Sequence, residues 1–407
     1  MLLRERLWDG AGHGGVDASV WLKIESADDD YRVTWGSGPP HPVAYTLDKN
    51  RIRNAAKKVR EILERLAQWS GSEDHARRRG ILIDLAAAGT NFRYQLFNHP
   101  AKRQEIKALQ SWIQDEYDAG DHQLEIQADS SIQIPWGLIF DGSADDPQTP
   151  PALDDISGEL QLFRGFWCLK YELIVTSGVF VRPRSSLRRP RRSFGLLTLL
   201  NADVEQEIHN HVNGCELATL DEECQLFVRP IGTARTLDEC QTLLSERDES
   251  SDIVFYFLGH HSDATLELGG GETIDDGEFS RLMDMLAERI ESGAKASCGL
   301  VFLNGCASAV GEQNINLRYY IERPELCGVI ATEAIVPTEY AHRFGVRFLN
   351  LLVRAGEPIC KVLQTLYHDP TFWPECLLYG CYAHALYQIE KPPAPPADTP
   401  DLCVTTV

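Results

Sequence analysis

Basic residues are scarce in this chain, and so is any long apolar stretch. Lys and Arg together number 39 against 60 Asp and Glu in 407 residues, which gives a formal net charge of −21. A field of that sign repels phosphate backbones, so the composition argues against a general nucleic-acid-binding protein. No run approaches the roughly 18 consecutive apolar residues of a membrane span. The longest apolar runs, such as 194–200 and 298–303, have the length of a buried strand. We therefore expect no membrane association and no direct binding to nucleic acid.

Targeting and metal-binding patterns are also missing. The first eight residues, Met-Leu-Leu-Arg-Glu-Arg-Leu-Trp, carry charges where a signal peptide has an apolar core, which predicts a cytoplasmic protein. The 11 cysteines include no C-x-x-C pair, so in a reducing compartment we expect free thiols that mostly fill the core. Cys376 and Cys381 have no matching second pair, and Gly269-Gly-Gly-Glu-Thr lacks the lysine of a phosphate-binding loop. We expect no metal site.

The first half of the chain combines strand and helix patterns. Residues 19–24 and 31–35 alternate apolar and polar side chains on either side of a turn, which predicts a β-hairpin in an N-terminal region of residues 1–49. A second region, residues 50–181, begins with helical periodicity opened by Asp48. Its expected helices cover 50–68, 78–97 and 101–117, and its expected strands cover 122–127 and 166–177.

One basic run interrupts this acidic chain. Residues 182–192 hold six arginines and two prolines and lie between the two halves. We interpret residues 182–193 as a solvated basic linker, and a processing or docking segment is a second interpretation. A nucleic-acid patch is a third, which is disfavoured because no aromatic residues are interleaved with the arginines.

Residues 194–390 alternate apolar strands with helices. Strands are expected near 194–200, 223–229, 252–258, 298–304 and 327–331, with a last strand within 376–388. Helices are expected near 202–213, 236–247, 277–291, 312–322, 338–354 and 357–367. Repeated β-α units with continuous apolar strands predict an α/β fold with a mostly parallel sheet covered on both faces. The remaining residues, 391–407, form a proline-rich tail that needs no packed structure.

Two of these strand ends carry residues suited to nucleophilic catalysis. The strand at 252–258 leads into His260 and His261, and the strand at 298–304 leads into Cys306. In doubly wound sheets reactive groups gather past the carboxyl ends of strands, so adjacent strands would bring a histidine beside the cysteine. Imidazole supplies the base that a thiol, with a free pKa of about 8.5, needs to react near neutral pH. The pattern predicts a Cys–His site. The alternative is that the cysteine packs in the core and the histidine is a satisfied polar residue.

Both segments resemble the catalytic motifs of CHAT-domain proteases, which belong to the caspase–separase clan of cysteine peptidases. The matching stretches are Phe257-Leu-Gly-His-His and Leu303-Asn-Gly-Cys-Ala-Ser-Ala. Similarity continues through residues 327–339, 341–355 and 357–367, and upstream in Ile134-Pro-Trp-Gly-Leu-Ile-Phe-Asp, which resembles the Pro-Trp-Glu segment of these proteins. The resemblance covers about residues 50–390, most specifically 250–385. It implies a caspase-like fold whose catalytic part spans residues 194–390, preceded by a helical and β-hairpin N-terminal portion.

The resemblance assigns roles by position. His260 becomes the general base and Cys306 the nucleophile, and the backbone N–H groups of His261 and Cys306 become the oxyanion donors. The family usually has glycine where this chain has His261. A backbone with φ > 0 at that position would be costly for histidine. An alternative alignment makes His261 the base.

The resemblance also indicates where a substrate would bind. Asn304 lies two residues before the nucleophile, where related enzymes often line the first specificity pocket. Some basic-specific relatives carry an acid there, so a neutral asparagine argues against a strong preference for Arg or Lys. Glu333 is a second candidate for the substrate pocket, with a surface position as its alternative.

The implied function is that of a cysteine endopeptidase acting on a protein substrate without a metal or organic cofactor. Such proteases in bacteria often act in antiviral defence or cell death and are regulated. We therefore expect a regulatory protein partner, or activation through residues 1–50. Two other functions stay open: a non-catalytic interaction module of the same fold, and a thiol hydrolase acting on a small amide.

Overall fold

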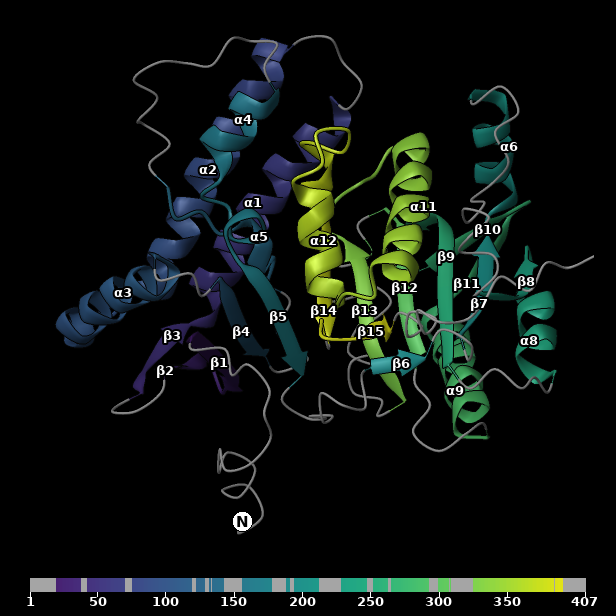
Figure 1. Ribbon diagram of the computed structural model, residues 1–407, viewed down its shortest axis with the longest axis horizontal. Helices are drawn as coiled ribbons and strands as arrows, with labels where there is room; N and C mark the ends of the chain where they lie inside the picture. The colour runs from purple at the N-terminus through teal and green to yellow at the C-terminus, as the bar shows by residue number, and fades with distance from the viewer. Residues whose placement is uncertain are drawn as a thin grey trace, which may run out of the picture.

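The computed structural model describes most of the chain. The described residues are 20–37, 42–69, 75–118, 122–128, 132, 134–142, 156–177, 188–190, 194–211, 228–246, 252–262, 265–292, 299–306, 308, 325–383 and 385–390. Within them, two mixed sheets with flanking helices form a mixed α/β fold (Figure 1). The α/β class expected from the sequence is confirmed. The helix expected at 312–322 and the tail at 391–407 lie outside the described residues.

A five-stranded sheet forms the N-terminal part, in the order β3-β2-β1-β4-β5. Its strands are β1 (Val20–Ala27), β2 (Asp30–Ser37), β3 (Val43–Asp48), β4 (Gln123–Ala128) and β5 (Glu172–Ser177). The expected hairpin is present as the antiparallel pair β1–β2, whereas β4 pairs in parallel with both β1 and β5. The sheet therefore joins residues on both sides of the boundary placed at residue 49. Deleting residues 1–50 would remove three of its five strands.

Three helices accompany this sheet, close to where periodicity placed them. They are α1 (Lys49–Gln68), α2 (His75–Phe97) and α3 (Arg103–Asp118). The Asp48 carboxylate accepts a hydrogen bond from the backbone N–H of Arg51 at 2.8 Å and so caps α1. The apolar face of α1, which includes Val59 and Leu63, is buried.

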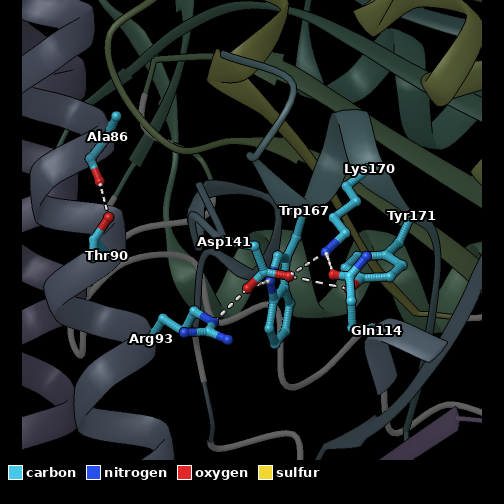
Figure 2. Close-up of polar contacts among 8 residues, drawn as sticks. All are labelled: Ala86, Thr90, Arg93, Gln114, Asp141, Trp167, Lys170 and Tyr171. Atoms are coloured by element: carbon cyan, nitrogen blue, oxygen red, sulfur yellow. Dashed lines mark hydrogen bonds and ion pairs between the residues drawn. The ribbon is translucent and has the colours of Figure 1, made fainter. Parts of the chain in front are cut away.

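A buried carboxylate fixes the end of the Ile134-Pro-Trp-Gly-Leu-Ile-Phe-Asp segment. Figure 2 shows Asp141 between Arg93 on one side and Lys170 and Tyr171 on the other, with Trp167 beside it. Arg93 Nε forms an ion pair with it at 2.6 Å, and three groups donate hydrogen bonds to it: Lys170 Nζ at 2.9 Å, Trp167 Nε1 at 3.0 Å and the Tyr171 hydroxyl at 3.1 Å. The sequence predicted one strand over 166–177. Instead a single helical turn, α5 (Trp167–Lys170), precedes β5 and turns two of these donors toward Asp141.

The C-terminal sheet has the parallel core β8-β7-β9-β12-β13, and the antiparallel strand β14 lies next to β13. Its strands are β7 (Phe194–Leu200), β8 (Arg229–Ala234), β9 (Asp252–Ser262), β12 (Gly299–Gly305), β13 (Leu326–Thr332) and β14 (Tyr379–Ala383). The last residues of β9 pair with β10 (Thr265–Gly269), which forms a hairpin with β11 (Glu272–Ile274). The sheet is therefore mostly parallel, as expected, although β8 begins where the sequence placed its end.

Alternate residues of the central strands fill two separate cores. On one face, Tyr256 and Phe302 belong to the core that includes α11 (Thr338–Ala355) and α12 (Ile359–Tyr367). On the other face, Phe255 and Val301 pack with α8 (Leu237–Ser245) and α9 (Asp276–Ser292). Figure 1 shows α11 and α12 on the near face of this sheet. Because side chains alternate along a strand, the even-numbered residues that follow in β9 and β12 continue the face that carries α11.

Part of the predicted linker pairs with the last strand of the predicted catalytic part. Arg188–Pro190 form a short strand, β6, that pairs in parallel with β15 (Gln388–Glu390). The rest of the predicted linker lies outside the described residues. Within the ranges that the structure describes, no helix has the length and apolar character needed to cross a membrane.

Candidate active site

His260 and Cys306 lie at the ends of neighbouring parallel strands. β9 and β12 are in register up to Gly259 opposite Gly305, so each of the two reactive residues directly follows a paired glycine. Both line one cavity of about 240 Å³. The rest of its lining comes from the same strand ends, from α6 (Ala202–His211) and from the start of α11: Val204, Leu258, Gly259, Asn304, Gly305, Val336, Thr338 and Ala341. The structure thus brings together the two residues that the sequence singled out.

The two paired glycines leave no room for a side chain. A Cβ on Gly305 would lie 3.0 Å from the carbonyl oxygen of Gly259 and 2.9 Å from the Phe257 ring. A Cβ on Gly259 would lie 2.9 Å from the Cβ of Asn201. Only glycine permits this close approach, which sets the separation of the residues that follow.

The Cys306 thiol faces Val336. Its Sγ donates to the Val336 carbonyl oxygen at 3.9 Å, and among the described residues no hydrogen bond joins it to the His260 ring. Burial is the main reason that the pKa of Cys306 is raised; hydrogen bonding lowers it in part, and the charges of Glu267 and Glu207 raise it again. In this arrangement the thiol is protonated at neutral pH.

The His261 ring contacts the main chain of Cys306. Its Nδ1 lies 2.8 Å from the carbonyl oxygen of Cys306, and because a carbonyl only accepts, Nδ1 carries the proton. The residue pairs with Leu266 in the β9–β10 ladder, and no positive φ occurs there. The strain considered for histidine at this position is therefore absent. Because His261 does not line the cavity, the geometry favours His260 as the base.

Two buried hydroxyl side chains fix the turn that carries Cys306. The Ser308 N–H donates to Thr332 Oγ1 at 3.1 Å, and the Thr332 N–H donates to Ser308 Oγ at 2.9 Å. The remaining hydroxyl protons are also used, because Ser308 donates to the Leu303 carbonyl and Thr332 to the Gly305 carbonyl. The end of β13 therefore holds the turn on both sides of Cys306.

Removing the Thr332 hydroxyl tests this anchor. Thr332→Val keeps the shape but leaves the Ser308 N–H and the Gly305 carbonyl without a partner, so we expect a loss of about 1–3 kcal/mol in the free energy of unfolding. Urea unfolding measures the loss. Thr365→Val is the control, because its hydroxyl is exposed and bonds only the Lys361 carbonyl in its own helix. Equal stability of the two variants would show that the hydrogen bonds of the Thr332 hydroxyl do not stabilise the fold.

Asn304 lines the cavity but its amide is already engaged. Its Nδ2 donates to the Tyr256 hydroxyl at 2.9 Å and to the Ala341 carbonyl at 2.7 Å, and its Oδ1 accepts from the Tyr379 hydroxyl at 2.7 Å. Only 1% of the residue is exposed. Its polar group therefore connects β9, α11 and β14 close to Cys306.

Glu333 is not brought to this cavity. It is 2% exposed, which excludes the surface position, and it accepts a hydrogen bond from Arg60 Nε at 2.8 Å. Burial raises the pKa of Glu333, and the Arg60 charge opposes that rise. The residue lines a separate cavity of about 490 Å³, together with Trp136 and Cys360. Its ion pair links α1 to the loop that carries Val336.

The other cysteines form no comparable site. None of the six cysteines whose side chains the structure describes is in a disulfide; Cys168, Cys240, Cys360 and Cys376 are buried, whereas Cys306 and Cys381 are partly exposed. Within the described ranges, no three His, Cys, Asp or Glu residues gather closely enough to hold a metal ion.

The sequence did not indicate the residues that line the cavity beside the start of α11. Val336 and Thr338 fall in the stretch 327–339 that was matched only as a strand and loop, and their residue types carry no chemical signal. Glu207, which accepts from the Thr338 hydroxyl at 2.8 Å, is one acidic residue among 60. Only the packing of α6 against α11 brings these positions to the cavity.

Comparison with known proteins adds no assignment. No family model matches this chain, and no curated protein matches it.

Proposed function

We propose that the chain is a CHAT-type cysteine endopeptidase with a caspase-like catalytic part, in which Cys306 attacks a protein substrate and His260 is the general base. The observation that carries this proposal is the position of both side chains in one cavity, at the ends of the adjacent parallel strands β9 and β12. The order and spacing of the two motifs support the same roles.

Attack requires the thiol to turn from Val336 toward His260. Both side chains line the same cavity, so rotation about the Cα–Cβ bond of Cys306 is the motion needed, and such rotations are fast. The described arrangement is then a resting site. The regulatory protein partner in this proposal would act on the loop at 333–337, which carries Val336 and is held to α1 by the Arg60–Glu333 pair.

The chemistry proceeds in two balanced steps. First, His260 takes the thiol proton and the thiolate sulfur bonds to the scissile carbonyl carbon; His260 then gives that proton to the leaving nitrogen as the C–N bond breaks. Second, His260 takes a proton from water, whose oxygen displaces the sulfur and releases a carboxylic acid, and Cys306 regains its proton. The backbone N–H groups of Cys306 and His261 stabilise the oxyanion in both steps.

Labelling with tripeptidyl acyloxymethyl ketones tests the proposal. These probes alkylate a thiol that has a base beside it, so we expect mass spectrometry to find the label on Cys306 and not on Cys381, the other partly exposed described thiol. Cys306→Ala should abolish labelling, and the matched variant Cys381→Ala should leave it unchanged. Labelling of the two cysteines at equal rates, or of neither by any probe, would contradict the proposal. The second outcome favours a non-catalytic module.

The size of the cavity supports a second candidate. The cavity is lined by only ten residues, which come mainly from the ends of β9 and β12, from α6 and from the start of α11, and this suits a small amide substrate of a thiol hydrolase. The same cavity also suits one side chain of an extended peptide. Labelling by tripeptidyl probes at least tenfold faster than by an acyloxymethyl ketone that carries a single amino acid would favour the peptidase.

A further inference from the structure

Two carboxylates lie near Cys306 on different elements, although neither lines the cavity. Glu207, on α6, accepts the Thr338 hydroxyl, and Thr338 lines the cavity beside Cys306. Glu267, on β10, is paired directly opposite His260 in the antiparallel ladder, which places the two side chains on the same face of the sheet. Both elements that carry these glutamates therefore adjoin the reactive residues.

A single buried asparagine holds these two elements together. Asn201 Oδ1 accepts from the N–H groups of Asp203 and Val204 at 2.8 and 3.0 Å and so fixes the first turn of α6. Its Nδ2 donates to the backbone carbonyl of Glu267 at 2.7 Å. The residue is 1% exposed. Asn201 thus fixes α6 and β10, the two elements that carry Glu207 and Glu267, relative to each other.

No described cation neutralises either carboxylate. Glu207 and Glu267 form no ion pair within the described part of the chain, and no Lys or Arg lines the cavity. Glu205, on the same helix as Glu207, shows the contrast, because it accepts from Arg235 at 2.6 and 2.7 Å. Both unneutralised charges also oppose formation of the Cys306 thiolate. Without a bound substrate, these two charges therefore make deprotonation of Cys306 less favourable.

We infer that the substrate carries a lysine or arginine next to the scissile bond, and that Glu207 and Glu267 bind its cationic side chain. This inference rests on the proposed peptidase function. A bound cation gains two carboxylate partners next to the residues that line the cavity, and its charge offsets the field that disfavours the thiolate. The Asn304 position does not argue against this preference, because its amide is bonded to Tyr256, Ala341 and Tyr379 and is not available to select a side chain.

Three acetyl-Ala-Ala-Xaa acyloxymethyl ketones test the inference on the full chain, with lysine, norleucine or aspartate as Xaa. Lysine and norleucine have similar shape and differ in charge, so we expect the lysine probe to label Cys306 at least about tenfold faster than the norleucine probe, with the aspartate probe slowest. Glu207→Gln and Glu267→Gln should each lower the lysine-to-norleucine ratio by about tenfold. Glu205→Gln, on the same helix but paired with Arg235, should keep the ratio.

The possible outcomes separate the two proposals. Cys306 labelling at equal rates by the lysine and norleucine probes would overturn the inference and leave the peptidase proposal standing. A lysine preference that persists in both glutamine variants would also overturn it, because the selectivity would then come from other groups. Failure of all three probes to label Cys306 would overturn the peptidase proposal itself.

Discussion

Replacing His260 with alanine is expected to slow acylation of Cys306 by about 10²–10⁴-fold, the usual contribution of a positioned general base. His260 lines the cavity with the thiol, whereas the ring of the adjacent His261 is bonded to the Cys306 carbonyl. His261→Ala removes the bond from its ring to the Cys306 carbonyl and leaves the lining of the cavity unchanged, so its expected effect is about tenfold or less. The inactivation rate with the best tripeptidyl probe measures both effects.

Chemical rescue separates a base from a structural residue. Free imidazole should restore part of the rate to His260→Ala, because it can occupy the vacated space beside the thiol and accept its proton. It should not change the rate of His261→Ala. Rescue of His261→Ala alone would reverse the two roles and support the alternative alignment, in which His261 is the base.

The proximity of His260 and Cys306 could be predicted from the sequence, because it follows from the order and direction of the strands that carry them. Apolar runs of strand length ended in His260 and Cys306, and parallel strands place their carboxyl ends at one edge. The hairpin and α1 were predictable for similar reasons, since alternation and the Asp48 cap are local signals. In each case the contacts that determine the structure are between residues close in sequence or paired in adjacent strands.

The hydrogen-bond and ion-pair partners of polar side chains could not be predicted in the same way. Asn304 and Glu333 were chosen as pocket residues from their positions relative to the motifs. The structure shows the Asn304 amide fully bonded and Glu333 paired with Arg60, which lies 273 residues earlier. Whether a polar group faces a ligand or a distant partner depends on tertiary packing. A single sequence gives no measure of that packing.

Asp141 is the polar position with the largest expected effect on stability. Its carboxylate is buried, forms an ion pair with Arg93 on α2, and accepts hydrogen bonds from Lys170 and Trp167 on α5 and from Tyr171 beside α5 (Figure 2). Burial alone would raise the pKa of Asp141, but the nearby Lys170 and Arg93 charges and the hydrogen bonds outweigh it, so the pKa is lowered. The ionised form therefore stabilises the fold.

Asp141→Asn is expected to lower the free energy of unfolding by about 3 kcal/mol at pH 7, because it leaves the Lys170 and Arg93 charges without their partner. The sign of the pH dependence follows from the lowered pKa. The stabilisation is fully present above the unfolded-state pKa of about 3.9 and is lost as the pH falls through the lower folded-state value. The difference between wild type and variant should therefore shrink below about pH 4.

Urea unfolding followed by tryptophan fluorescence at pH 7, 5, 4 and 3 measures this difference, and Trp167 lies against the altered group. Asp84→Asn is the matched control. Its ion pair with Arg65 has a similar length, 3.0 Å, but both side chains are about half exposed, at 52% and 51%. An exposed pair of this kind contributes less than about 1 kcal/mol, so the control should change little at any of these pH values. If Asp141→Asn and Asp84→Asn lost equal stability, or if the loss at Asp141 persisted undiminished at pH 3, then the ionised carboxylate would not be what holds the Ile134–Asp141 segment against α2 and α5.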